Sequence, residues 1–374
     1  MAFHFEPQMS RHLEHNSTTR MRSLIGAARI ALCTLFIILE SAWAISAICF
    51  DCKPSGTRPL AITVYLVVWM ALLIFFHLPL QRLLASILCF AVVLFWWLSL
   101  APSNNGQWQA DVSRTAYAEV HGSLITFHNV RSCDYRSEFD YTCQWLTRQV
   151  DLDRVRGVDL FMDYWGSPWI AHSILSFDLG PDPSGTDAAG VHRIAFSIEA
   201  RKQVGQRYSS IRGFFRQYTL ISVVSDERDV VRLRTNYRHD EDLYLYHTIA
   251  SPAFARSLLL DYVAFTNQLH NRPQWYNAVT RNCTTEIYTF QVMKGRPYDW
   301  RILFNGKADA MLYEQGELAT DLPGQSPSSP RMSFAELKRR AYINPAAKAA
   351  NQDPAFSERI REQRPGFGKE ELEQ

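Results

Sequence analysis

Three long apolar runs occupy the first hundred residues, and the rest of the chain mixes short apolar and polar segments as soluble domains do. The runs cover residues 24–50, 60–78 and 83–101. Each reaches the roughly 20 residues that a helix needs to cross the hydrocarbon core of a bilayer. The first run is longer than the core of a usual signal peptide, and two more follow it. We therefore expect a three-helix transmembrane anchor over residues 24–101, preceded by a short segment, 1–23.

The charges around these runs predict the orientation of the chain. Arg11, Arg20 and Arg22 precede the first run, and basic residues favour the cytoplasmic side of a membrane. Three crossings then place everything after residue 101 outside the cytoplasm. In that compartment nucleic acid is not expected as a partner.

The region 104–318 shows the patterns of an α+β domain. Alternating or short apolar segments predict strands of an antiparallel sheet at 118–127, 158–162, 169–177, 194–199, 218–224, 229–234 and 243–248. Apolar residues at helical spacing predict a helix over 254–270 that packs on this sheet. The remaining residues, 319–374, are rich in Pro and Ser and then charged, which predicts a partly ordered polar tail with one short helix at 334–340.

Seven cysteines occur in the chain, and their positions suit an oxidising exterior. Cys33 and Cys89 lie well inside apolar runs and are expected to be packing residues. Cys49 with Cys52, and Cys133 with Cys143, are close enough in sequence for each pair to close a small disulfide. Cys283 is left over, and an unpaired cysteine outside the cytoplasm is a candidate reactive thiol. A zinc site is a poor interpretation because no histidine has the required spacing, and no metal or cofactor is expected.

Cys283 lies where the sequence predicts the start of a helix, after a proline-bearing turn and among residues that cap helices, including Asn282. The free N–H groups of a first helical turn stabilise a thiolate, the nucleophilic form of cysteine. The alternative is that Cys283 is a small buried packing residue. A nucleophile needs a base and a group that orients the base, and we expect His172 and Glu199, on neighbouring strands, in these roles. His121, His128 and His247 remain open as other bases.

A basic and aromatic segment, 201–238, contains eight Arg and one Lys against three acids. Such a surface suits lipid phosphates at a bilayer face. An equally acceptable interpretation is a solvated face whose charges pair internally. On the first interpretation the substrate-binding residues are expected to be Trp165, Arg201, Tyr208, Arg216 and Asn282.

Six segments together resemble one known family, the Lnb N-terminal periplasmic domain: 127–131, 164–173, 197–201, 212–218, 226–230 and 276–285. The resemblance covers roughly residues 120–310. It implies a circularly permuted papain-like thiol enzyme with a Cys-bearing helix, at a bacterial inner membrane, with Cys283 and His172 as the catalytic pair. The associated activity is acyl transfer from phospholipid to the N-terminus of a lipoprotein. Cys133 and Cys143 depart from the family pattern, and the three-helix anchor need not be shared.

The sequence therefore predicts a membrane-anchored thiol acyltransferase that moves a fatty acyl group through a Cys283 thioester to an amine. Papain-like folds also host hydrolases, so a periplasmic cysteine peptidase or amidase acting on cell-wall peptide is a second hypothesis. A third is a non-catalytic membrane scaffold. Acylation of Cys283 by phospholipid would separate the first hypothesis from the other two.

Overall fold

A computed structural model of the protein describes residues 8–180, 192–281, 299, 301, 305–325 and 330–368. The chain divides into two compact units. The membrane unit comprises Met1–Ala101 with Phe215–Gln217, and the sheet unit comprises Pro102–Phe214 with Tyr218–Gln374. The main division falls where the last apolar run ends.

The membrane unit consists of α1 (Gln8–Asp51), the short 3-10 helix η1 (Ser55–Thr57), α2 (Arg58–Phe75) and α3 (Pro79–Ser99). Three helical stretches are long and apolar enough to cross a membrane: Leu24–Asp51, Ser55–Phe75 and Pro79–Ser99. Aromatic side chains join the first and third helices, because the rings of Trp43 and Trp97 lie 5.3 Å apart. The prediction of three apolar N-terminal helices is confirmed.

The sheet unit contains, in its described residues, one eight-stranded sheet with the order β1-β2-β7-β6-β5-β4-β8, and β3 pairs with β2 beside this path. Its strands are β1 (Tyr117–His121), β2 (Leu124–Tyr135), β3 (Tyr141–Asp151), β4 (Gly157–Trp165), β5 (Ala171–Asp178), β6 (Arg193–Arg201), β7 (Thr219–Ser225) and β8 (Glu241–His247). Its described helices and helical turns are η2 (Ala110–Val112), η3 (Leu152–Arg154), η4 (Arg212–Phe214), α4 (Glu227–Arg232), the π-helical turn η5 (Leu233–Tyr237), α5 (Pro252–Asn271), η8 (Asn305–Lys307), α7 (Ala308–Glu314), α8 (Phe334–Ala341), α9 (Asn344–Ala349) and α10 (Phe356–Arg359).

The strand pairings confirm the α+β class and refine the expected sheet. Every strand pairing is antiparallel except that of β2 with β7, which run parallel where Arg131 lies opposite Ser225. The sheet is therefore mixed and not purely antiparallel. The predicted segment 118–127 is a hairpin of β1 and the start of β2, with Gly122 at a φ of 64° in the turn.

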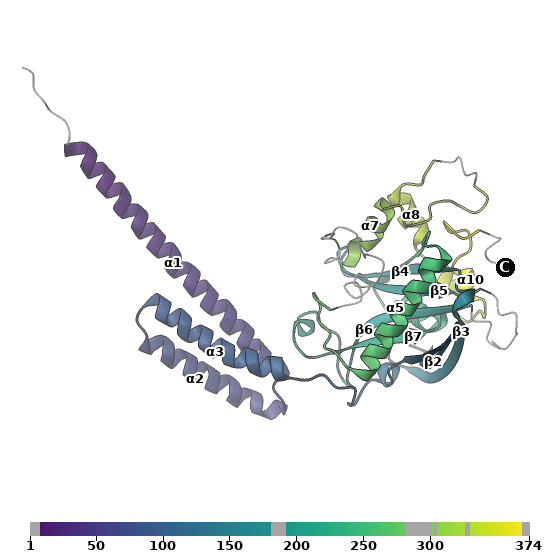
Figure 1. The fold of residues 1–374 in the computed structure, drawn as a ribbon, viewed down its shortest axis with the longest axis horizontal. Helices are drawn as coiled ribbons and strands as arrows, with labels where there is room; N and C mark the ends of the chain where they lie inside the picture. Colours follow the sequence, from purple (N-terminus) through teal and green to yellow (C-terminus); the bar gives the residue numbers. More distant parts are fainter. Residues whose placement is uncertain are drawn as a thin grey trace, which may run out of the picture. The chain divides into compact units, whose positions relative to one another are not determined.

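The long helix α5 covers one face of the sheet (Figure 1). Ser251 caps its start, since its Oγ accepts a hydrogen bond from the backbone N–H of Phe254 at 3.3 Å. The buried face of α5 includes Leu258, Leu259 and Tyr262. The Tyr262 ring lies 5.1 Å from that of Phe196 on β6, so the apolar stripe read from the sequence packs on the sheet as expected.

The opposite face of the sheet is covered by α4, η5, α9 and α10, and here one prediction is wrong. Residues 229–234 were expected to form a strand, because Val230 and Val231 favour strands. The structure places them in α4 and η5. Asp226 decides the outcome: its side chain accepts a hydrogen bond from the N–H of Asp229 at 3.0 Å and so caps a helix start. Both valines then point into the core.

The C-terminal region contains more structure than the sequence predicts. A partly ordered tail was expected over 319–374, whereas residues 330–368 contain α8, α9 and α10. Ile343, Phe356 and Ile360 are fully buried in the same apolar cluster as Phe161 and Ile174 of the sheet. These residues are widely spaced along a polar segment, so no periodic apolar pattern in the sequence predicts that they are buried.

The two expected disulfides have different outcomes. Cys133 and Cys143 are bonded across the β2–β3 pair, where they lie directly opposite each other. Cys49 and Cys52 are free thiols, so the suggestion of a second bridge is wrong. Helical bonding continues past α1 to the N–H of Cys52, and residues three apart on a helix have Cβ atoms about 5–6 Å apart, more than a disulfide spans.

Candidate functional site

His172 occupies the second position of β5, directly opposite Asp163 of β4 in the strand register. On the other side, β6 pairs with β5 so that Ser197 lies opposite Ile174. Side chains two residues apart in a strand share a face, so Ser197 and Glu199 point to the same side of the sheet as His172. Three neighbouring strands thus present polar groups to one place on the sheet.

A hydrogen-bonded relay joins three of these groups. His172 Nε2 lies 2.7 Å from Ser197 Oγ, and Ser197 Oγ donates to Glu199 Oε1 at 2.7 Å. Because the single hydroxyl proton of Ser197 goes to the carboxylate, the hydroxyl can only accept from the imidazole. The proton of a neutral His172 is therefore on Nε2, which leaves the lone pair on Nδ1. That nitrogen is the one able to accept a proton from a nucleophile.

Arg234 ties this relay to a second carboxyl pair. Its guanidinium donates to Glu199 Oε1 at 3.0 Å and forms an ion pair with Asp163 Oδ2, also at 3.0 Å. The Arg234 side chain is 3% exposed, so both contacts are shielded from water. Glu241 of β8 also lines this part of the site, and its negative charge acts on the Asp163 carboxyl.

Burial and charge set the protonation of the relay. Burial, with the charge of Arg234 added to it, lowers the pKa of His172 to about 3, although Glu199 acts in the opposite direction. Burial would raise the pKa of Glu199, but the charges of Arg234 and Arg131 outweigh it and hold that pKa well below its usual range. Burial and the charge of Glu241 raise the pKa of Asp163 well above its usual range. The site therefore holds a neutral imidazole beside an ionised Glu199.

Five of these residues, namely Asp163, His172, Glu199, Arg234 and Glu241, line a cavity of about 1120 Å³ in the sheet unit. Polar lining residues include His172, Glu199 and Arg234, and apolar or aromatic ones include Trp165 and Tyr208. The volume slightly exceeds that of typical small-molecule pockets, which are about 300–1,000 Å³. A mainly apolar wall with a few convergent polar groups is the ordinary composition of a substrate site.

The residues predicted from the sequence have different fates in the structure. His172, Glu199, Trp165 and Tyr208 all line the cavity. Cys283 and Asn282 lie outside the described residues, so the expected helix start and the distance from Cys283 to His172 stay predictions.

Two arginines predicted to bind substrate are placed elsewhere. Arg201 is buried, and its guanidinium donates to the carbonyl oxygens of Val112 and Ser113 at 2.8 and 2.9 Å. It braces the segment before β1, because those carbonyls need donors once they are removed from water. Arg216 belongs to the membrane unit, where its guanidinium lies 4.3 Å from the centre of the Trp97 ring. Neither is among the residues that line the cavity.

Four polar groups of the site were missed from the sequence: Asp163, Ser197, Arg234 and Glu241. A signal existed for Ser197, since it precedes Glu199 by two residues in an alternating strand and must share its face. Asp163 also had a signal, since it alternates with Asp159 and Phe161 along β4 and must share their face. Arg234 lies in the π-helical turn η5, which was predicted to be the end of a strand. The sequence pattern around it therefore gave no indication that its side chain reaches Glu199.

Replacing Ser197 with Ala is expected to lower turnover by about 10- to 100-fold, which corresponds to the loss of one or two charge-assisted hydrogen bonds. The imidazole would lose the acceptor that holds its proton on Nε2. Nitrogen NMR of His172 should therefore show a larger Nδ1–H population in this variant. Ser222→Ala is the matched control, because Ser222 is equally buried on β7 but bonds Thr266 at 2.8 Å on the α5 side. Equal loss in both variants would contradict the relay.

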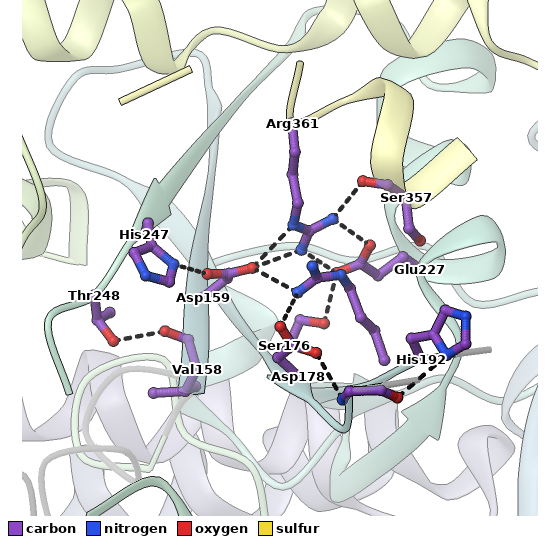
Figure 2. Close-up of polar contacts among 12 residues, drawn as sticks. Val158, Asp159, Ser176, Asp178, His192, Glu227, His247, Thr248, Ser357 and Arg361 are labelled. Carbon is purple, nitrogen blue, oxygen red and sulfur yellow. Dashed lines mark hydrogen bonds and ion pairs between the residues drawn. The ribbon is translucent and has the colours of Figure 1, made fainter. Parts of the chain in front are cut away.

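A second polar cluster is built around Asp159, Glu227 and Arg361 (Figure 2). Asp159 lies four residues before Asp163 on β4, so the two side chains share one face of the sheet. Arg361 is fully buried and its Nη2 lies 2.7 Å from Asp159 Oδ2 and 2.6 Å from Glu227 Oε1. His247 Nδ1 also contacts Asp159, at 2.8 Å. These charges are neutralised within the cluster, which joins the C-terminal region to β4 and α4.

No group of three or more His, Cys, Asp and Glu suited to a metal ion occurs in the described part of the chain. The fold and site define an α+β domain with a buried His–Ser–Glu relay on the wall of a large cavity, in a chain with three apolar helices. Residues 141–306 match the family model of the Lnb N-terminal periplasmic domain, which confirms the resemblance seen in the sequence. No curated protein and no solved structure matches the chain.

The matched region and the apolar helices together indicate a membrane protein with a periplasmic domain. The match includes β4, β5, β6 and the relay residues, and it extends over Cys283.

Proposed function

We propose that this protein is a membrane-anchored thiol acyltransferase of the bacterial inner membrane. Cys283 is the nucleophile, His172 is its base, and Ser197 with Glu199 orients the base. The donor is a phospholipid, and the acceptor is an amine such as the N-terminus of a lipoprotein. On this proposal the N-terminus of the chain is cytoplasmic and the sheet unit is periplasmic.

The observation that carries the proposal is the His172–Ser197–Glu199 relay, whose His172 and Glu199 line the cavity. The relay leaves Nδ1 of a neutral imidazole as the proton acceptor, which is the state a base needs before it activates a thiol. Histidine on one strand, the orienting group on the next and cysteine later in the chain is also the order of a circularly permuted papain-like domain. The family match over residues 141–306 supports the same assignment.

In the first step His172 Nδ1 takes the thiol proton, and Sγ of Cys283 attacks the carbonyl carbon of a lipid ester. Negative charge forming on sulfur would raise the low resting pKa of His172, so the imidazole gains base strength as the proton moves. The ester C–O bond then breaks, and the leaving lysophospholipid oxygen takes the proton from the imidazole. N–H groups of the predicted helix start at Cys283 suit the oxyanion.

In the second step the acceptor amine attacks the thioester carbonyl and loses a proton to His172. The C–S bond then breaks, and the imidazole returns that proton to the Cys283 sulfur. No oxidation or reduction occurs, and the acyl group is conserved throughout. Water in place of the amine would give hydrolysis, so the acceptor decides between transferase and hydrolase.

Intact-mass analysis of the purified protein after incubation with phospholipid vesicles tests this function. We expect a gain of one fatty acyl mass, mapped to Cys283, that disappears when a peptide amine is added as acceptor. Modification by cell-wall peptides in place of lipid would support the cysteine amidase instead. Absence of any covalent adduct, with rapid breakdown of the thioester excluded by a quench series, would contradict both enzymes and favour a scaffold.

A further inference from the structure

Exposed apolar side chains surround the cavity that holds the relay. Six residues both line the cavity and are more than two-fifths exposed: Phe139, Trp169, Ile170, Val204, Phe214 and Val279. We call this set the apolar collar. Its members come from the β2–β3 turn, the β4–β5 turn, the loop after β6 and the segment after α5.

The exposure of the collar is unusual for a water-facing surface. Phe139 is 76% exposed and Val204 is 68% exposed. Scattered apolar residues are normal on a protein surface, but a set gathered around one cavity marks a place where a ligand, partner or membrane covers it. The cavity wall behind the collar is itself rich in aromatic residues, so the apolar character continues inward.

The charges of residues 202–214, which we call the collar loop, favour a membrane over a ligand or a partner protein. Residues 202–214 contain Lys202, Arg207 and Arg212 and no Asp or Glu. The Arg207 guanidinium lies 5.9 Å from the centre of the Phe139 ring, so a cation and an apolar side chain sit together at the mouth. Basic groups beside exposed Phe, Trp and aliphatic side chains are the composition that binds the headgroup and acyl boundary of anionic bilayers.

The collar is covalently linked to helices that can cross a membrane. The sheet unit begins at Pro102, shortly after α3 ends at Ser99, and α3 is one of the three stretches able to cross a membrane. The collar loop also continues directly into Phe215–Gln217, which belong to the membrane unit. A surface tethered in this way meets lipid at high effective concentration, so even weak insertion is sufficient.

We propose that the apolar collar inserts into the headgroup and outer acyl region of the bilayer in which this chain is anchored. Insertion opens the cavity toward lipid, so that an acyl tail enters between apolar side chains without crossing water. Insertion of the collar would explain how the proposed enzyme reaches its lipid substrate. Only the kinetic effects given below rest on the proposed function.

Photo-crosslinking tests the insertion without any catalysis. The full-length Cys283→Ala protein is reconstituted in vesicles of phosphatidylethanolamine and phosphatidylglycerol that contain a phosphatidylcholine with a diazirine in its acyl chain. After irradiation, we expect lipid adducts on peptides carrying Phe139 and residues 204–214. Ile249 is the internal control, since it is 60% exposed in the sheet unit and does not line the cavity. Equal adducts at Ile249, or adducts confined to the apolar helices, would overturn the inference.

A paired set of variants gives the second readout. Phe139→Asp combined with Val204→Asp should reduce adducts at the remaining collar peptides by about tenfold and raise KM for vesicle-borne phospholipid by about tenfold, because two apolar contacts are replaced by repulsive charges. Ile249→Asp should change neither. Failure of acyl transfer with collar adducts intact would count against the proposed function alone. Acyl transfer without collar adducts would count against insertion alone, and a dimer that the collar variant dissociates would identify a second copy as the occupant.

Discussion

Replacing Cys283 with Ala is expected to abolish turnover, and replacing His172 with Ala is expected to reduce it by about 10²–10⁴-fold. The first change removes the atom that carries the acyl group, and the second removes the base that activates it. The measurement is transfer of a labelled acyl group from phospholipid to a peptide amine, with mass analysis of the enzyme itself. A thioester should be absent from the Cys283 variant and form slowly in the His172 variant.

His128→Ala is the matched control for His172, because His128 lies on β2 of the same sheet and does not line the cavity. It should leave turnover within about twofold of the original, as surface substitutions away from a site do. Full activity in the Cys283→Ala protein would sink the mechanism. A His128 variant as impaired as the His172 variant would show that the assay reports folding.

Replacing Arg361 with Ala is expected to lower the free energy of unfolding of the sheet unit by about 3–5 kcal/mol, the usual cost of leaving a buried charge without its partner. Arg361 is fully buried between Asp159 and Glu227, which would both lose it (Figure 2). Arg359→Ala is the control. Its side chain is 54% exposed and pairs with Asp353 at the surface, where solvent screens the pair, so its removal should change the free energy of unfolding far less than removal of Arg361.

The destabilisation should depend on pH in a definite direction. Arg361 holds the pKa values of Asp159 and Glu227 below their usual range against the effect of burial. A carboxyl with a depressed folded pKa contributes stability above its unfolded pKa, near 4, and loses that contribution as pH falls. The difference between the original protein and Arg361→Ala should therefore narrow below about pH 4. Urea titration with brief proteolysis measures it, and a difference that is constant with pH would assign the effect to packing.

The sequence predicted best those elements whose cause is local. A bilayer requires an uninterrupted apolar run, so three helices could be recognised without tertiary information. The strands that carry His172 and Glu199 alternate or are continuously apolar, and α5 has a clear apolar stripe. The hairpin strand β3 was not predicted, because its outward side chains include Thr, Gln and Arg and its pattern resembles a polar loop.

Other features depend on contacts between distant segments, so no short stretch of the sequence could predict them. Val230 and Val231 favour a strand, yet the Asp226 cap and a neighbouring sheet face made the segment helical. Arg234 reaches Glu199 from that helical segment, so the error about its secondary structure also hid its role. Arg201 looks like a surface cation in the sequence, and only the placement of residues 112 and 113 shows why it is buried.

The distance along the chain between Asp159 and Arg361 has a consequence for biosynthesis. These residues are 202 positions apart, and Arg361 is also needed by Glu227. A polypeptide still emerging from the translocation channel presents β4, β5 and α4 to the periplasm well before residue 361 arrives. During that interval Asp159 can pair with Arg193 and His247, but both acids lack Arg361, so burying them costs more free energy than in the complete chain. We therefore expect complete burial of Asp159 and Glu227 to come late in secretion, after the C-terminal helices have arrived.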